Sequence, residues 1–332
     1  MKLYDWPDIE ARFRNNLLLG NGASIAIDER FSYRLLYEEV SSYSEPNKEL
    51  LNLFEHYKTT NFELILRLLL ETHRVNEILG IDDHKTKKYY LELRNALIQT
   101  IRHIHPKYEE VKHHFTKVTK FVSRFKKVLS LNYDLLVYWA MLTYNEKHGQ
   151  WFKDCFVHGE FEKDFSYLGS PYGAAKGATL VFYPHGTLFL ATEPFGGEVK
   201  LSSSEKDYLL DSVLSKWEQE DYIPLFVSEG ASQEKLRAIT RNSYLNTVFD
   251  SVLAKLSGSL AVYGWSFSDQ DQHILGALTR RGFGQIAISV YKKDRDWESF
   301  CDGVTDKIRK YPRLKDCKIY FFDAENRGCW IY

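Results

Sequence analysis

The residues best suited to chemistry fall in four short polar clusters, each of which adjoins an apolar run. The clusters are Gly20 to Ser24, Asn132 to Asp134, His185-Gly186, and Gly264 to Asp269. In open α/β sheets, ligands bind beyond the carboxyl ends of the strands. One strand that ends in polar residues means little, but four such endings in one chain predict a shared crevice.

The first cluster, Gly20-Asn21-Gly22-Ala23-Ser24, has the composition of a phosphate-binding loop. Two glycines let the backbone approach an anion closely, and the helix that follows offers free N–H groups and the positive end of its dipole. The loop departs from the usual dinucleotide fingerprint because Ile25 stands at the third glycine position, and no Gly-Lys-Ser/Thr follows. Taken alone, the loop is equally consistent with a plain tight turn.

The elements that must position these clusters alternate between strands and helices. This alternation implies right-handed βαβ units and a parallel sheet covered on both faces. The sequence therefore predicts a doubly wound, Rossmann-like α/β fold. The expected strands are 17–19, 128–131, a pair at 179–183 and 188–191 around Pro184-His185-Gly186, 223–227, 260–263, 285–291 and 318–322, and the expected helices include 135–143, 204–220, 233–256, 270–281 and 297–310.

Between the first two strands the apolar period becomes helical. Apolar residues recur at i, i+3, i+4, i+7 and i+8 from Phe62, and further helices are expected at 87–102 and 107–127. The chain of 332 residues is long enough for one large domain with an insertion, or for two domains. We expect a Rossmann-like domain made of residues 1–44 and 128–332, interrupted by a helical insertion at 45–127.

In content and order, Gly-Asn-Gly-Ala-Ser, Leu-Asn-Tyr-Asp, His-Gly and Gly-Trp-Ser-Phe-Ser-Asp together resemble the motifs of the sirtuin-like NAD-binding clan. The likeness is to its prokaryotic branch without a zinc module, the sirtuin-like NAD hydrolases of anti-phage defence. It covers residues 14–27 and about 128–290.

This resemblance implies a role for each matching residue. The loop at 20–24 would wrap the pyrophosphate and ribose, with Asn21 in place of the family's first alanine. Asn132 and Asp134 would lie beside the nicotinamide ribose, and Gly264 and Ser266 would line the adenosine side. The implied catalytic residues are His185, Asn132 and Asp134, and the implied binding residues are Gly20, Asn21, Gly22, Ala23, Ser24, Gly264 and Ser266.

The implied activity is an NAD glycohydrolase that releases nicotinamide and ADP-ribose, with NAD as substrate and no metal. Nicotinamide leaves as a neutral base, so the site must stabilise an oxocarbenium-like ribose and position a nucleophile. A histidine of near-neutral pKa, His185, would relay a proton. Asn132 would hold the ribose hydroxyls or water, and Asp134 would orient the site or stabilise the developing positive charge.

Each assignment has a plainer alternative. His185 could be an ordinary turn histidine, and the second candidate for catalysis is His158 in Val157-His158-Gly159. Asp134 could cap the helix that follows it, and capping is the favoured interpretation of Ser268 and Asp269.

Two other functions compete with NAD hydrolysis. A sirtuin-type deacylase would need a four-cysteine zinc module, and the cysteine spacings of 146, 16 and 12 residues cannot supply one. A non-catalytic sensor of NAD or ADP-ribose would have no need of Asn132 and His185 together. The cysteines are Cys155, Cys301, Cys317 and Cys329.

Charge and histidine placement limit the partners. With 44 Lys+Arg against 45 Asp+Glu, the chain lacks the basic excess of a protein that coats nucleic acid. Seven histidines between His56 and His114 are expected to be solvent-facing helix residues rather than metal ligands. The basic stretch 102–127 is expected to be a solvated face, or a docking surface for an acidic partner or nucleic acid.

An unregulated NAD hydrolase would deplete its host, so we expect control by a trigger. The expected means are a homo-oligomer and an activating protein or nucleic-acid-associated partner that binds the helical insertion. Short apolar runs, an acidic N-terminal stretch and unpaired thiols predict a cytoplasmic protein without a membrane span. The choice between NAD and NADP, and between linear and cyclised product, stays open.

Overall fold

The core of the computed structural model is an eight-stranded parallel sheet, and the residues described are 2–32, 36–43, 48–193, 197–219, 222–227 and 231–332. All of its neighbouring strands pair in parallel. Across the sheet the strands are β1 (Leu3–Tyr4), β13 (Lys318–Asp323), β12 (Gln285–Val290), β11 (Ser259–Tyr263), β2 (Asn16–Leu19), β3 (Lys127–Ser130), β7 (Thr179–Phe182) and β4 (Phe152–Lys153).

The strand order reverses between β2 and β11. From β2 the chain moves to β3 and β7 on one side, and from β11 to β12 and β13 on the other. This is the topological switch point of a doubly wound sheet, where ligands bind. Leu19 at the end of β2 pairs with Tyr263 of β11 and with Ser130 of β3, so these three strands end level. The predicted Rossmann-like fold is confirmed.

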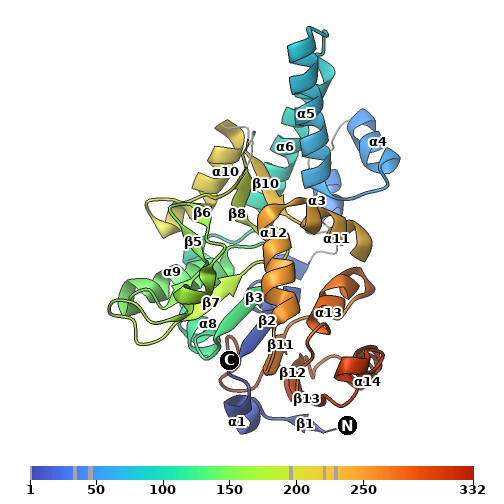
Figure 1. Ribbon diagram of the computed structural model, residues 1–332. Helices are drawn as coiled ribbons and strands as arrows, with labels where there is room; N and C mark the ends of the chain where they lie inside the picture. The colour runs from blue at the N-terminus through green and yellow to red at the C-terminus, as the bar shows by residue number, and fades with distance from the viewer. Residues whose placement is uncertain (1, 33–35, 44–47, 194–196, 220–221, 228–230) are drawn as a thin grey trace.

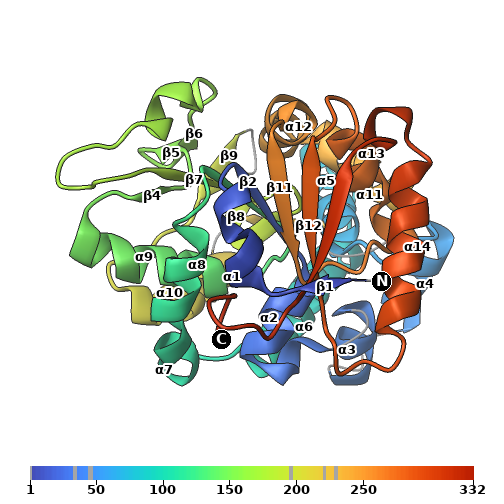
Figure 2. The ribbon, with the colours of Figure 1, turned by 90° about the horizontal axis from the view of Figure 1, so that it is seen from below.

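Helices flank the parallel sheet (Figure 2). Every residue of β2, β7 and β11 is buried, as expected for strands covered on both faces. The helices outside the stretch between α2 and α8 are α1 (Trp6–Ile9), α2 (Asn21–Ile27), α8 (Phe115–Val122), α9 (Leu136–His148), α10 (Leu209–Gln219), α11 (Ser232–Arg241), α12 (Ser243–Thr247), α13 (Gln272–Leu278) and α14 (Trp297–Arg309).

The predicted strands around His185 belong to different sheets. The first is β7, whereas the second, β8 (Gly186–Thr192), lies between β10 (Ile223–Phe226) and β9 (Glu198–Lys200) in an antiparallel sheet. The expected pairing between them was therefore wrong. Gly186 has a φ of +73°, and a Cβ there would lie 2.1 Å from the Leu225 carbonyl oxygen, so the turn uses glycine to bring the two backbones together. A short hairpin joins β5 (Phe156–Val157) to β6 (Glu160–Phe161).

The stretch between β2 and β3 is helical. It contains α3 (Leu36–Tyr43), α4 (Lys48–His56), α5 (Phe62–Leu79), α6 (Lys85–Ile104) and α7 (Tyr108–Val111) before α8. Helices α5 and α6 form a hairpin that projects from the rest of the molecule (Figure 1). The predicted insertion, 45–127, remains a prediction as a separate unit, and its residues 45–47 lie outside the described part. In that part, no helix has both the length and the apolar character to cross a membrane.

One predicted helix, 233–256, is broken. Asn242 lies between α11 and α12 with an extended backbone, and its side chain accepts a hydrogen bond from the Leu245 N–H at 2.9 Å. An asparagine that caps a new helix start ends the preceding helix, which is why the continuous helix expected from the apolar pattern does not form. After α12 the chain continues as a π-helical turn at Val248–Val252.

Candidate functional site

The structure brings the four predicted polar clusters to one edge of the sheet. Gly20 follows β2, Asn132 follows β3, His185 follows β7, and Gly264 follows β11. The four strands are direct neighbours in the order β11-β2-β3-β7. The clusters therefore lie beyond adjacent strand ends and straddle the switch point.

The glycines of the first and last clusters pack against each other. The Gly22 N–H donates to the Gly264 carbonyl oxygen at 2.7 Å, and the Gly20 N–H donates to Tyr263 at 2.9 Å. A Cβ on Gly22 would lie 2.8 Å from the Gly264 Cα, and one on Gly264, whose φ is +70°, would lie 2.3 Å from the Ala23 nitrogen. Close backbone contact between the two loops therefore requires these glycines, whatever the loops bind.

Behind this contact lies a buried group that we call the Ser24 network: Gly20, Ser24, Asn132 and Asp134. The Asn132 amide donates to the Gly20 carbonyl oxygen at 3.0 Å and to Ser24 Oγ at 2.8 Å. Ser24 in turn donates to Asp134 Oδ2. Two strand ends of the sheet are thus held together by side chains that all come from the predicted motifs.

Asp134 also bonds the start of the helix that follows it, in line with the plainer alternative to a role in catalysis. Its Oδ1 accepts the Leu136 N–H at 2.9 Å, at the first turn of α9. Burial raises the pKa of Asp134, while the hydrogen bonds from Ser24 and Leu136 act in the opposite direction. This carboxyl is therefore a fixed, buried acceptor that serves both the helix and the network.

A histidine from the helical region supports the same loop. His105 follows the last residue of α6, and its Nε2 accepts the Leu135 N–H at 3.1 Å while its Nδ1 contacts the Pro106 carbonyl oxygen at 2.8 Å. Burial lowers the pKa of His105 to about 4, so the ring is neutral at pH 7. For His105, the prediction of a solvent-facing residue was wrong, because it lies beneath the Asp134 loop rather than on the outer face of a helix.

On the other side of the site lies a second group that we call the histidine cluster: His185, Ser232, Lys235, Asp271 and His273. The Nε2 atoms of His185 and His273 are 3.0 Å apart and share a hydrogen bond. The Nδ1 of His273 is 3.1 Å from Ser232 Oγ, which also accepts the His273 backbone N–H at 2.8 Å. These contacts join β7, α11 and α13.

The cluster carries one ion pair. Lys235 donates to Asp271 Oδ1 at 2.9 Å, and the indole N–H of Trp265 lies 3.2 Å from Oδ2. Burial would raise the pKa of Asp271, but the His185 ring, which is charged only at low pH, the Lys235 ammonium and the two hydrogen bonds outweigh it and lower the pKa to about 2. Asp271 is therefore an anion under all ordinary conditions.

The two histidines of the cluster are neutral at pH 7. Burial is the main cause that lowers the pKa of His185 far below its ordinary value, and the nearby Lys235 ammonium adds to it. Burial likewise lowers the pKa of His273, to about 4. The expected near-neutral pKa of His185 was wrong, because the ring is only 4% exposed and lies close to a buried cation.

Within the described part of the chain, the same cluster supplies the residues that could hold a divalent metal. One ligand atom from each of His185, Asp271 and His273 lies within 4.8 Å of the others. The Lys235 ammonium already provides a positive charge beside Asp271, and a metal would have to coexist with it or displace it. That the protein uses no metal stays a prediction.

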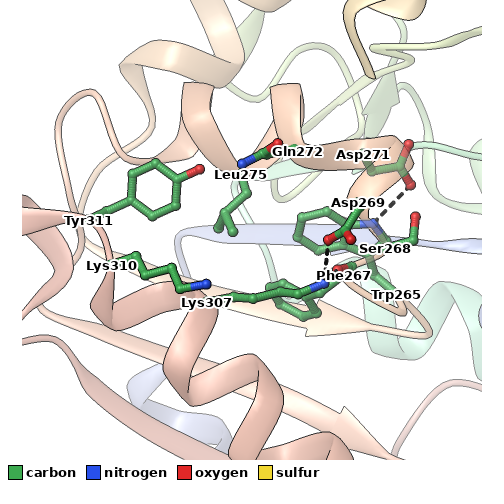
Figure 3. Close-up of a pocket in the computed structure, with 10 residues that line it drawn as sticks. All are labelled: Trp265, Phe267, Ser268, Asp269, Asp271, Gln272, Leu275, Lys307, Lys310 and Tyr311. Carbon is green, nitrogen blue, oxygen red and sulfur yellow. Dashed lines mark hydrogen bonds and ion pairs between the residues drawn. The ribbon is translucent and has the colours of Figure 1, made fainter. Parts of the chain in front are cut away.

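A cavity of about 300 Å³ opens beside the Gly264 loop (Figure 3). Trp265 and Phe267 lie with ring centroids 4.0 Å apart. Lys307 donates to the Phe267 carbonyl oxygen at 2.9 Å and to Asp269 at 2.8 Å. Aromatic rings beside ammonium groups suit a ligand that joins a planar ring to an anionic group. The lining residues are Trp265, Phe267, Ser268, Asp269, Asp271, Gln272, Leu275, Lys307, Lys310 and Tyr311.

The remaining predicted residues have more ordinary positions. Asn21 donates to the Phe31 carbonyl oxygen, and Ser266 is exposed in the Gly264 loop. Ser268 stands at the start of the short helix 269–271 but makes no capping bond with its side chain, and Asp269 pairs with Lys307 instead. The expected caps there were wrong. His158 is exposed in the turn between β5 and β6.

The sequence analysis missed four members of the histidine cluster: Ser232, Lys235, Asp271 and His273. The last two had a usable signal, because Asp271-Gln272-His273 closely follows the Gly264 motif. Ser232 and Lys235 had none, since they lie in a region where the sequence shows only an amphipathic helix.

The sheet order defines a doubly wound α/β protein, and the four polar clusters gather at its switch point. The chain belongs to a family described as Domain of unknown function (DUF4917), whose model matches residues 17–330. A search of curated proteins finds no match.

Proposed function

We propose that this chain is an NAD glycohydrolase that cleaves the bond between nicotinamide and ribose. The observation that carries the proposal is the meeting, at the switch point, of the four motifs that resemble those of sirtuin-like NAD hydrolases. Gly20 of the first motif and Gly264 of the last are 244 residues apart in the sequence, yet the four motifs lie beyond the ends of four adjacent strands. A dinucleotide that spans the switch point would contact all four.

The proposed reaction does not require a general acid. The leaving nicotinamide is neutral, so the site needs negative potential near the ribose and a held water molecule. The amide N–H groups of Asn132 already donate to Gly20 and Ser24, so its amide oxygen is the atom that would accept a hydrogen bond from a ribose hydroxyl or water.

The His185 ring contacts His273 through Nε2 and makes a second hydrogen bond to the Leu131 backbone, so it would leave one of these partners to accept the proton of the attacking water. The neighbouring Asp271 anion would stabilise the imidazolium that results.

The cavity beside the Gly264 loop supports binding of the adenosine half. Trp265 and Phe267, which are each 4% exposed, would contact a purine through the parts of their rings that line the cavity. Lys310, and Lys307 where it is not held by Asp269, would offer positive charge to a phosphate. This half of the ligand would add binding energy at a distance from the bond that breaks, which an enzyme can use to orient the reacting ribose.

Nicotinamide release from NAD by the purified protein tests the proposal. We expect turnover by the parent and a loss of about 10²-fold or more in His185→Asn, since a proton acceptor is typically worth 10² to 10⁴ in rate. The matched control is His158→Asn, which changes the exposed histidine and should retain parental activity. Thermal unfolding of each variant shows whether a loss of activity comes from a loss of the folded structure. Parental activity in a folded His185→Asn protein would remove His185 from the mechanism.

One observation favours a second candidate, a sensor that binds NAD or ADP-ribose without cleaving it. The Nε2 of His185 is engaged by His273, as suits a residue that only shapes the site. Calorimetry with ADP-ribose, beside the nicotinamide assay, distinguishes the two. Binding without turnover, in the absence and presence of lysate from phage-infected cells, would favour the sensor, whereas turnover in either condition would favour the hydrolase. The proposed control by a trigger, through a homo-oligomer or a partner of the helical region, predicts higher turnover with that lysate.

A further inference from the structure

A second cavity, of about 320 Å³, lies at the β4 edge of the parallel sheet. It is lined by residues of α9, β4, β5 and β9, whereas α13 and α14 line the cavity beside the Gly264 loop. Figure 2 shows these two groups of elements on opposite sides of the molecule. Small-molecule sites have volumes of about 300 to 1,000 Å³, so this cavity is large enough for a small organic ligand.

Most of the cavity wall is apolar. The apolar side chains come from two consecutive residues of α9, from β4 and β5, and from the short helix Phe165–Gly169. Such a wall favours the hydrocarbon part of a ligand, because contact with it removes apolar surface from water. The apolar lining residues are Met141, Leu142, Phe152, Phe156, Val157 and Leu168.

Two of the three charged groups in the cavity wall neutralise each other. Lys200 donates to Asp154 Oδ2 at 2.8 Å, and the Phe156 N–H donates to Asp154 Oδ1 at 3.1 Å. Both oxygens of this carboxylate therefore have a donor from the protein. Asp154 and Lys200 form a closed ion pair that leaves no net charge.

The third charged group, Lys153, is held in a different way. Its Nζ donates to the Leu168 carbonyl oxygen at 2.8 Å and to the Ser170 carbonyl oxygen at 2.7 Å. Among the residues that the structure describes, it makes no ion pair with a carboxylate. An ammonium group has three N–H donors, so one remains for a ligand. Two neutral carbonyl groups thus fix a positive charge at the cavity wall without neutralising it.

The pKa values of the two lysines show the same difference. Burial lowers the pKa of Lys153. Burial acts on Lys200 in the same direction, but the Asp154 carboxylate and Tyr138 outweigh it and raise the pKa of Lys200. Lys153 is therefore a partly desolvated cation that lacks the anionic partner its neighbour has.

We infer that this cavity binds a small organic anion, a carboxylate with an apolar body. The carboxylate would accept the free N–H of Lys153, and the hydrocarbon part would lie against Met141 and Leu142. Two ammonium groups and one carboxylate leave one positive charge in the wall, which matches a ligand with one negative charge. The inference does not depend on the proposed hydrolase activity.

The first test compares two probes that share a hydrocarbon chain and differ in charge, octanoate and octanol. Ligand-observed NMR titrations with the full-length protein measure both affinities. We expect saturable binding of octanoate and binding of octanol that is about tenfold weaker or more, because a hydrogen bond between two charged groups is stronger than one to a neutral hydroxyl. Equal affinities, or no saturable binding of octanoate, would overturn the inference.

The second test changes the charge at Lys153. Lys153→Met removes the ammonium group and keeps an unbranched chain, so octanoate should bind about tenfold more weakly while octanol binds as before. Lys153→Arg keeps the charge and should retain most of the octanoate affinity. The matched control is Lys310→Met, which removes a lysine from the cavity beside the Gly264 loop and should leave octanoate binding unchanged.

A third variant addresses the apolar part of the cavity and does not touch the contacts that Lys153 makes with the backbone. Leu142→Trp places a larger side chain in the cavity and should weaken octanoate and octanol alike by about tenfold or more. Thermal unfolding shows which variants are folded. Parental octanoate affinity in folded Lys153→Met or Leu142→Trp protein, or a loss in Lys310→Met, would overturn the inference.

The titrations separate this site from the proposed function. Binding of octanoate by a protein that releases no nicotinamide from NAD would support the anion site and contradict the hydrolase. Release of nicotinamide by a protein that binds no octanoate would do the reverse.

Discussion

The Ser24 network and the histidine cluster lie beyond adjacent strand ends, are both largely buried, and yet are built from different chemistry. In the network, the Asn132 N–H groups and the Ser24 hydroxyl bond to fixed acceptors, and its one titratable group is Asp134. The cluster contains two histidines, a lysine and a carboxylate around one point. The first arrangement fixes geometry, and the second can move charge. In the proposed hydrolase, holding the substrate and reacting with it would be divided between neighbouring strands.

The largest effect is expected at the glycine contact beside the network. Gly264→Ala would place a Cβ 2.3 Å from the Ala23 nitrogen, at a φ of +70°. We expect it to lower the free energy of unfolding by about 2 to 5 kcal/mol, from overpacking and left-handed strain combined. Urea denaturation measures the change.

Gly276→Ala is the matched control, because a Cβ there meets nothing within 4 Å. It lies inside α13, where alanine should be neutral or stabilise by about 0.5 to 1 kcal/mol. Equal effects of the two substitutions would show that the loops are not packed as described.

Removing Asn132 from the network should cost more stability than removing Ser232 from the cluster. Asn132→Ala removes two buried hydrogen bonds, one to the Gly20 carbonyl oxygen, which keeps the Ala23 N–H as a donor, and one to the Ser24 hydroxyl, and should cost about 2 kcal/mol. Asn21→Ala, which removes one amide contact with Phe31, should cost about 1 kcal/mol or less. We expect Ser232→Ala to resemble Asn21→Ala. Denaturation midpoints that rank Ser232→Ala above Asn132→Ala would reverse the proposed division of tasks.

The two carboxyl groups should give opposite pH dependences of stability. The pKa of Asp134 is raised in the folded state, so its contribution falls as the pH rises above the ordinary value of 3.8. The pKa of Asp271 is lowered to about 2, so its contribution is present above 3.8 and is lost as the pH falls toward 2.

Urea midpoints between pH 2 and 7 for the parent, Asp134→Asn and Asp271→Asn test this pair. Relative to the parent, Asp134→Asn should gain stability as the pH rises, and Asp271→Asn should lose it. Differences that slope in the same direction would contradict the electrostatic contrast between the two groups.

The smallest effect is expected at Ser268, which begins a short helix but makes no capping bond with its side chain. Ser268→Ala should change the free energy of unfolding by less than about 0.5 kcal/mol. Asn242→Ala removes a cap that does bond the Leu245 N–H, and should cost about 1 kcal/mol. Thermal unfolding resolves the two, and a larger loss at Ser268 would reveal a role in the loop that its contacts do not account for.

The network could be predicted from the sequence because each member follows directly from a strand end. An apolar run such as Val128 to Leu131 predicts both the strand and the position at which polar side chains follow it. The same signal placed every strand from β2 to β13 that is longer than three residues. An apolar run does not indicate which strands pair with each other, so β8 and β10 were not expected to form their own antiparallel sheet.

Apart from His185, which follows β7, the cluster was not predicted, because its other members come from helical segments. Ser232 and His273 are 41 residues apart, and their contact depends on how α11 and α13 pack. Helical periodicity identifies a buried face but not the residue it will meet. His105 shows the same limit, since its position after α6 suggested solvent until the loop that carries Leu135 was placed beside it.

The α5–α6 hairpin connects an exposed end of the molecule to the candidate site. Its tip carries Ile78 and Leu79, which are 84% and 65% exposed, and α6 runs back from the tip as 20 residues, a rod of about 30 Å. That rod ends at His105, which holds the backbone next to Asp134. Helix α6 thus connects the exposed tip of the hairpin to the residue that supports the loop of Asp134.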